Sequence, residues 1–240
     1  MTTQSDIEIL HEDDGLLAVN KPAGLLAVPD RFDKAKANLF DLLRANRVGQ
    51  YLGNVHRLDR HTSGVMIFAK TSDAYRQLTA QFRERQTRKV YATIYQGRPA
   101  DQVIDRPIGE RPDRPGYSRI DEKNGKPARS RVRVREEFRG YAWLEVEIET
   151  GRPHQIRVHL QAIGHPLMGD ADYGGAPLRL SDLKPGYKPK PGVEERPLLA
   201  RPALHAAAVT LVQPALTIRA PLPKDIEVAL RYLRRFSAVG

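Results

Sequence analysis

The sequence of 240 residues contains no cysteine. This absence excludes a disulfide framework and every thiolate-bound zinc or iron–sulfur site, and it fits a protein kept in a reducing compartment. The histidines offer no replacement, because His154 and His159 are five positions apart on a predicted helix, whereas a zinc-binding helix places its pair four apart. We therefore expect no metal site.

Signatures of membrane insertion and of nucleotide cofactors are missing as well. The N-terminus MTTQSDIEIL lacks the basic region and the apolar run of a signal peptide, and no stretch approaches the roughly 18 apolar residues of a membrane span. Neither GxGxxG nor GxxxxGK[ST] occurs, so nucleotide-binding folds lose their usual sequence support. We expect a cytoplasmic protein with no membrane segment and no nucleotide cofactor.

Basic residues are what the chain has in excess. Lys and Arg total 39 against 29 Asp and Glu, which gives a net charge of +10 at pH 7. Such a charge attracts polyanions, of which nucleic acid is the commonest. The 40% hydrophobic content is ordinary for a folded protein, and the chain is long enough to bury a core. Charge alone leaves nucleic-acid binding and an ordinary basic protein equally open.

The hydrophobic pattern predicts strands and helices in mixed order. Alternating or continuous apolar runs predict strands at residues 7–11, 16–20, 65–69, 89–95, 131–135, 141–150, 204–212 and 216–220. The helical period predicts helices over residues 38–48, 72–85, 153–163 and 225–236, the second capped by Ser72 and the third with Pro153 in its first turn. Residues 99–130, apart from one short hairpin, and residues 177–202 are predicted to be loops. This order favours an α+β fold around a mixed, largely antiparallel sheet, in a single domain over residues 1–240.

Two predicted elements carry polar side chains away from their apolar rows. Strand alternation puts Tyr91 on the face opposite Ala92 and Ile94. Helical spacing puts Arg157 off the stripe formed by Ile156 and Leu160. We expect both side chains to project from rigid elements.

The stretch VHRLDRHTSG, residues 55–64, places Asp59 between Arg57 and Arg60. An exposed ion pair needs no such setting, since it is worth only about 0–1 kcal/mol. A neighbouring guanidinium favours the ionised carboxylate, as a reactive acid requires. Taken alone, however, Asp59 and Thr62 to Gly64 are also common turn-forming residues.

HRLDRHTSG resembles the HRLDxxTSG signature of the RluA-type RNA pseudouridine synthases. Three further segments match the family in order, RKVYATIYQG, TGRPHQIRVHLQAIGHPLMGD and RPALHAAAVTL, and the opening VNKPAGLLAVP also fits. The resemblance runs from about Ile9 to Pro223. It implies a pseudouridine synthase fold with a basic central cleft, with a core over residues 9–223 followed by the helix 225–236. The chain is expected to depart from many relatives in lacking an N-terminal S4-like RNA-binding module, since only about eight residues precede the first predicted strand.

The resemblance also implies an activity and the residues that carry it. Uridine within RNA is isomerised to pseudouridine without a cofactor, and Asp59 is the catalytic residue. It acts either as a nucleophile at ribose C1′ or as a base that removes the 2′-hydrogen, and the sequence leaves both routes open. By similarity Arg157 keeps this carboxylate ionised, Tyr91 stacks on the target uracil, and Arg57 fills the space of the extruded nucleotide.

Other basic residues are expected to contact RNA, so that binding weakens with salt. They are Lys21, Arg60, Arg88 and Lys89, with Arg83 and Arg85 near them and Lys184, Lys188 and Lys190 in the loop 177–202. The implied partner is a stem-loop of ribosomal or transfer RNA, and a monomer is the default oligomeric state.

Two other functions stay open. A base-removing glycosylase or nucleoside hydrolase would also use an acid at C1′, but glycoside hydrolysis generally needs a second carboxylate, and none accompanies Asp59 in its motif. A non-catalytic RNA-binding protein would need the basic residues but not Asp59.

Overall fold

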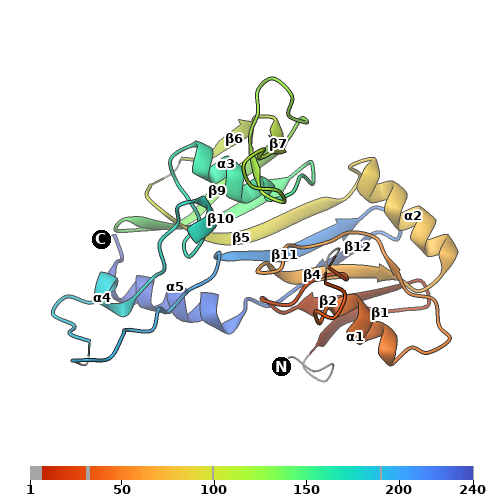
Figure 1. Cartoon of the computed structure of the whole chain (residues 1–240), viewed down its shortest axis with the longest axis horizontal. Coiled ribbons are helices and arrows are strands. Elements are labelled where there is room, and N and C mark those ends of the chain that lie inside the picture. Colours follow the sequence, from red (N-terminus) through yellow and green to blue (C-terminus); the bar gives the residue numbers. More distant parts are fainter. Residues whose placement is uncertain (1–6, 31–32, 99, 190, 240) are drawn as a thin grey trace. The chain divides into compact units, whose positions relative to one another are not determined.

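The computed structural model describes residues 7–30, 33–98, 100–189 and 191–239. The elements, in chain order, are β1 (Glu8–Glu12), β2 (Leu16–Lys21), α1 (Leu39–Ala45), β3 (Gly53–Asn54), β4 (Ser63–Ala69), α2 (Ser72–Arg83), β5 (Arg88–Gln96), β6 (Gln102–Asp105), β7 (Ile108–Glu110), β8 (Ser118–Ile120), β9 (Arg129–Phe138), β10 (Tyr141–Ile148), α3 (Gln155–Ala162), the 3-10 helix η2 (Ala171–Tyr173), α4 (Leu180–Leu183), β11 (Leu204–Leu211), β12 (Leu216–Arg219) and α5 (Lys224–Phe236) (Figure 1). They form two compact units, Met1–Val90 with His205–Pro221, and Tyr91–Leu204 with Leu222–Gly240.

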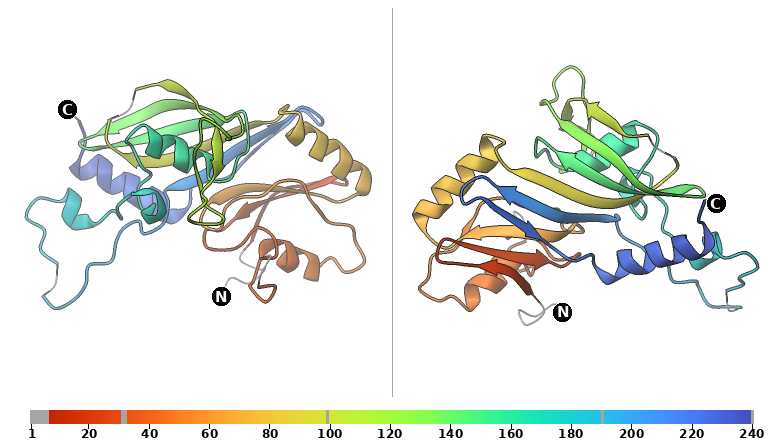
Figure 2. Two further views of the ribbon diagram at one scale, coloured as in Figure 1. Left: turned by 45° about the horizontal axis from the view of Figure 1, so that its top comes forward. Right: turned by 180° about the vertical axis from the view of Figure 1, so that it is seen from behind.

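In the first unit, four strands lie in the order β1-β2-β4-β11, as Figure 2 shows. β3 pairs with β4 and β12 with β11. All these pairs are antiparallel except β4 with β11, which is parallel. Every residue of β4 is buried, as expected for a continuous apolar run. Leu78 of α2 packs with Ile67 of β4 and Val209 of β11 in the core of this unit.

In the second unit, β5, β10, β9 and β6 are neighbours in that order, and β7 pairs with β8 in a separate hairpin. Ile156 and Leu160 of α3 pack on the apolar side of β9 and β10, where Val132 and Val146 lie. The buried residues of α5 belong to another cluster, which also includes Ile94 of β5 and Phe138 of β9. The packing of Ile156 and Leu160 holds α3 against β9 and β10.

The α+β class and the largely antiparallel sheet predicted from the sequence are confirmed. The cap predictions need correction. Thr71, not Ser72, caps α2 by accepting a hydrogen bond from the Ala74 N–H. Pro153 lies outside α3, because His154 before the helix has a left-handed backbone, with φ of 54°. None of the helices within the described residues combines the length and apolar character needed to cross a bilayer.

Both segments predicted as loops contain more structure than expected. Residues 99–130 include β6, which pairs with β9, in addition to the β7–β8 hairpin. Residues 177–202 include α4, and Leu178, Leu183 and Leu199 are buried in the second unit's core. This segment is therefore anchored at several points rather than freely exposed, although Lys190 lies outside the described residues.

Candidate active site

The motif HRLDRHTSG forms the connection from β3 to β4 in the first unit. Its apolar and hydroxyl side chains are buried, with exposed fractions of 6% for Leu58, 3% for Thr62 and 2% for Ser63. Its charged side chains are more accessible, since Arg57 and Arg60 are exposed and Asp59 is half-buried. The connection is thus held by its uncharged residues and presents its charged ones.

His56 anchors the start of this connection. Its Nε2 accepts a 3.0 Å hydrogen bond from the Ile67 N–H, and its ring stacks on Phe82 at 4.5 Å. Burial, together with the charge of Lys89, lowers the pKa of His56 to about 3. The imidazole is therefore neutral at pH 7, and its observed contacts are those of a structural residue.

Ser63 and Gly64 join the motif to β11, far along the chain. Ser63 Oγ lies 3.0 Å from Nδ1 of His205, and His205 and Ala206 pair with Ser63 and Gly64 in parallel register. On the other side of the ring, His205 Nε2 lies 3.4 Å from the carbonyl oxygen of Ala220. The late Leu-His-Ala segment thus supports the loop that carries Asp59.

The position of Lys21 corrects the sequence-based expectation. Lys21 is fully buried, and its ammonium donates hydrogen bonds to the carbonyl oxygens of Pro22, Leu25 and Arg60, at 2.9, 2.6 and 3.0 Å. Arg60 also donates through Nε to the carbonyl oxygen of Gly24 at 2.9 Å. A buried ammonium must be matched with acceptors, so Lys21 braces the Asp59 loop instead of lining an RNA surface.

Lys89 is also buried, with 8% of its surface exposed, but its setting differs from that of Lys21. No acceptor for its ammonium is found among the described residues. Burial, helped by the charge of Arg85, lowers its pKa to about 8. Its neighbour Arg88 is exposed. Burying this ammonium costs stability, and such a cost is understandable if Lys89 binds an anion. That role stays a prediction.

Replacing Lys89 by Met should therefore stabilise the fold at pH 7. The folded-state pKa is below the unfolded one, so the wild type is penalised below about pH 8, and the penalty disappears as the pH rises toward 10.5. We expect Lys89→Met to raise the free energy of unfolding by up to about 3 kcal/mol at pH 7 and by less at pH 9.5, measured by urea denaturation. Lys36→Met, at an exposed lysine, is the control; a loss of stability in Lys89→Met at pH 7 would contradict the prediction.

Tyr91 and Arg157 lie in the second unit. Tyr91 is half-buried on β5 and packs beside the cluster that contains Ile156 and Leu160 of α3, whereas Ile94 belongs to the other cluster. The predicted alternation of β5 is therefore confirmed. Arg157 does not project as expected, because only 6% of it is exposed.

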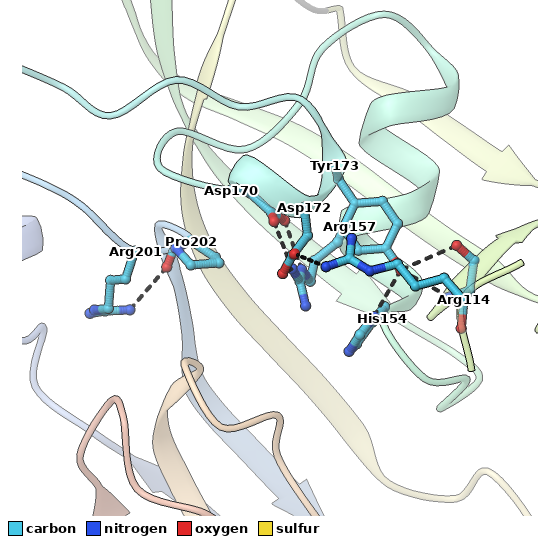
Figure 3. A network of polar contacts seen from close by, with 9 residues as sticks. Arg114, His154, Arg157, Asp170, Asp172, Tyr173, Arg201 and Pro202 are labelled. Carbon is cyan, nitrogen blue, oxygen red and sulfur yellow. Dashed lines mark hydrogen bonds and ion pairs between the residues drawn. The ribbon is translucent and has the colours of Figure 1, made fainter. Parts of the chain in front are cut away.

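Two carboxylates hold the Arg157 guanidinium (Figure 3). Nε and Nη2 donate to Oδ2 and Oδ1 of Asp170 at 2.7 and 2.6 Å, and Nη2 also donates to Asp172 at 3.1 Å. The guanidinium carbon lies 4.6 Å from the centre of the Tyr173 ring. Arg157 is thus fixed on one edge and covered on one face.

A second layer of contacts supports Tyr173 and Asp172. The Tyr173 hydroxyl donates to the Ser118 carbonyl oxygen at 3.1 Å, accepts from the Ser118 N–H at 3.0 Å, and lies 2.8 Å from His154 Nδ1. Arg114, from the β7–β8 connection, donates to Asp172 at 2.8 Å. Partial burial raises the pKa of Asp172, but Arg114 and Arg157 outweigh it and hold this pKa below its usual range.

The eight residues predicted for the site are thus divided between the two units. The first holds Asp59, Arg57, Arg60, Lys21, Arg88 and Lys89, and the second holds Tyr91 and Arg157. Sequence reasoning missed Asp172, Tyr173 and the role of Asp170. The signal that could have found them is the run Gly169-Asp-Ala-Asp-Tyr-Gly-Gly175, where acids alternate within glycines. The pairing of Asp59 with Arg157 stays a prediction.

Known proteins resemble this chain over most of its length. The sequence model of a family described as RNA pseudouridylate synthase matches residues 15–162. "Ribosomal large subunit pseudouridine synthase D" of Nitrosomonas europaea is 38% identical over 95% of this chain, which spans 65% of that relative's length. "Dual-specificity RNA pseudouridine synthase RluA" of Escherichia coli (strain K12) is 37% identical, with 89% of this chain and 92% of the relative covered. The solved structure of "Human RNA Pseudouridylate Synthase Domain Containing 4" is 28% identical, has a TM-score of 0.72, and is covered to 93% by 95% of this chain.

Proposed function

This chain belongs to the RNA pseudouridylate synthase family, and from that membership we propose that it converts uridine to pseudouridine within RNA. The observation that carries the proposal is the β3–β4 connection. There a half-buried acid is flanked by two exposed arginines, in a loop that is anchored by the buried Leu58, Thr62 and Ser63 and by His56, which is bonded to the sheet. Reactive groups are typically presented in this way, on a loop held by a rigid scaffold.

In the proposed reaction the bond between ribose C1′ and N1 of uracil breaks, the base turns, and C5 joins C1′. The proton that leaves C5 is balanced by one that N1 gains, so no atom is lost and no oxidant is consumed. Asp59 starts the reaction, either by attacking C1′ or by removing the 2′-hydrogen. Both routes need an ionised carboxylate, and we assign Arg157 as the cation that favours it.

In this proposal Tyr91 and Arg57 stabilise the extruded uridine and the bases that remain stacked. An RNA uridine must leave its stack before C1′ can be reached, at a cost of a few kcal/mol. The exposed Arg57 guanidinium is planar and can stack on the bases that remain. Tyr91, half-buried on β5, can stack on the extruded uracil. Arg60, Arg88 and Lys89 contribute positive charge toward the phosphates.

The substrate that we propose is a stem-loop of ribosomal or transfer RNA. The relatives' names point to large-subunit ribosomal RNA in one case and to a dual specificity in another. The chain covers 92% of the dual-specificity relative and 65% of the other. Such substrates place the enzyme in the cytoplasm, where we expect it to act as a monomer.

Carbodiimide mapping of pseudouridine in total RNA tests the proposal. RNA from a strain that lacks the gene is incubated with the purified chain, and new stops of reverse transcription mark the modified uridines. We expect one or a few defined sites and an unchanged RNA mass. Release of free uracil would instead indicate a glycosylase, and binding without any product would indicate an RNA-binding protein.

A further inference from the structure

Arg157 is gripped in a way that goes beyond the pairing of a buried charge. A guanidinium has five N–H donors in a rigid plane. Asp170 takes Nε–H and one Nη2 hydrogen, and Asp172 takes the other. These bonds engage three of the five N–H groups, and neither carboxylate is bonded to Nη1. The bonds to Asp170 and Asp172 therefore fix the orientation of the Arg157 guanidinium.

The grip is itself rigid. Asp170 has no exposed surface, and the turn that carries it admits only glycine at two positions. A Cβ on Gly169, where φ is +74°, would lie 2.1 Å from the Arg201 carbonyl oxygen, and a Cβ on Gly175 would lie 1.7 Å from that of Leu167. The Asp170 carbonyl oxygen accepts hydrogen bonds from the N–H groups of Tyr173 and Gly175 at 3.0 and 2.8 Å. Asp170 therefore cannot follow Arg157 if that side chain moves.

An arginine without such support samples many rotamers, and its alignment with a reacting group would be lost. A cation stabilises an anion most when it is oriented before the reaction starts. We propose that Asp170 is a positioning residue that aims the Arg157 guanidinium, and that Asp172 sets how much positive charge it presents. This rests on the proposed function, in which Arg157 favours the ionised Asp59.

Several charged and titratable groups surround Asp172. Arg114 reaches it from the β7–β8 connection and Arg157 from α3. Asp170, which precedes the 3-10 helix η2, binds the same Arg157, and His154 and Tyr173 lie in the same network. Two carboxylates face the single guanidinium of Arg157, and the positive charge of Arg114 offsets part of the excess negative charge. Neutralising Asp172 should leave Arg157 more effective as a cation. A carboxylate that it serves would then stay ionised to lower pH.

Single-turnover rates of pseudouridine formation, measured from pH 5 to 8 with RNA affinity and melting temperature, test the assignment. We expect Asp170→Asn to lower the maximal rate about 100-fold, as for a catalytic group displaced by about 1 Å, with RNA affinity unchanged. We expect Asp172→Asn to keep most of the rate at pH 7 and to move the acidic limb of the profile about one unit lower. In nitrogen-15 spectra, the protected Arg157 Nε–H signal should be lost in Asp170→Asn and kept in Asp172→Asn.

Asp225→Asn is the matched control, because Asp225 binds Arg201 through two bonds, at 2.7 and 3.0 Å, in the same unit. It should lower the melting temperature and leave the rate of the folded enzyme intact. A folded Asp170→Asn with the wild-type rate, or one with no larger loss than Asp225→Asn, overturns the assignment. If Asp170→Asn does not fold, Asp172→Asn provides the test. An acidic limb of its pH–rate profile at the wild-type position would then contradict the proposal. Asp59→Asn is measured alongside, so that wild-type activity in this variant would refute the proposed function itself.

Discussion

Asp59→Asn should abolish pseudouridine formation while leaving the fold and RNA binding intact. The side chain keeps its size, and its place in the β3–β4 connection depends on neighbouring groups: His56 bonded to Ile67, and Ser63 facing His205. An amide can neither attack C1′ nor remove a proton, so both open routes fail. We expect the single-turnover rate to fall at least about 10⁴-fold, as for other catalytic residues of this kind.

Arg57→Gln provides the contrast to Asp59→Asn. It removes an exposed positive charge from the same loop and should weaken RNA binding, with a shallower dependence on salt. Filter binding at two salt concentrations separates the variants, since Asp59→Asn should bind within about threefold of wild type. Residual product in Asp59→Asn at more than a few per cent of the wild-type rate would contradict the catalytic assignment.

Gly64→Ala should unfold the protein or nearly so. Gly64 has φ of +114°, and a Cβ there would lie 2.2 Å from the carbonyl oxygen of Ala206, on the paired strand β11. Backbone on both sides cannot yield as a flexible side chain would. The left-handed strain of about 1–2 kcal/mol adds to the cost of the overlap. We expect a loss above about 4 kcal/mol, a large share of the 5–15 kcal/mol by which domains are usually stable.

Gly49→Ala separates the overlap from the backbone strain. Gly49 also has a positive φ, +77°, but no atom lies within 4 Å of the place that its Cβ would take. This variant should cost only about 1 kcal/mol. Urea denaturation followed by circular dichroism measures both. Equal losses in the two variants would show that the close approach of β4 and β11 is not what demands glycine in the motif.

Local chemistry explains why most of the elements could be predicted. Strand alternation predicted β5 and β10, and the four-residue spacing of Ala74, Leu78 and Phe82 predicted α2, because these periods follow directly from backbone geometry. The errors occurred where a neighbour changed the outcome. Thr71 competes with Ser72 for the same cap, and β6 forms because β9 supplies its hydrogen bonds.

The same distinction between local pattern and long-range contact applies to the candidate site. The resemblance of one short motif to a family identified Asp59, and the comparisons support that family. Lys21, by contrast, looked like any basic residue near the substrate. Its acceptor on Arg60 is 39 positions away, and no pattern within a strand or helix reveals such a contact. Arg157 was expected to project from its helix, and its burial was missed for the same reason, since Asp170 and Tyr173 belong to other elements.

By itself the sequence determined the α+β class, most helices and strands, the family, and the acid proposed for catalysis, because short-range periods and contiguous motifs encode these. Only the tertiary structure decided which charges are buried and what holds them: the ammonium of Lys21 on three carbonyls, Ser63 on a histidine 142 positions later, and Arg157 on Asp170. The physical reason is that desolvation and pairing depend on which segments meet when the chain closes, and that is a property of the whole fold.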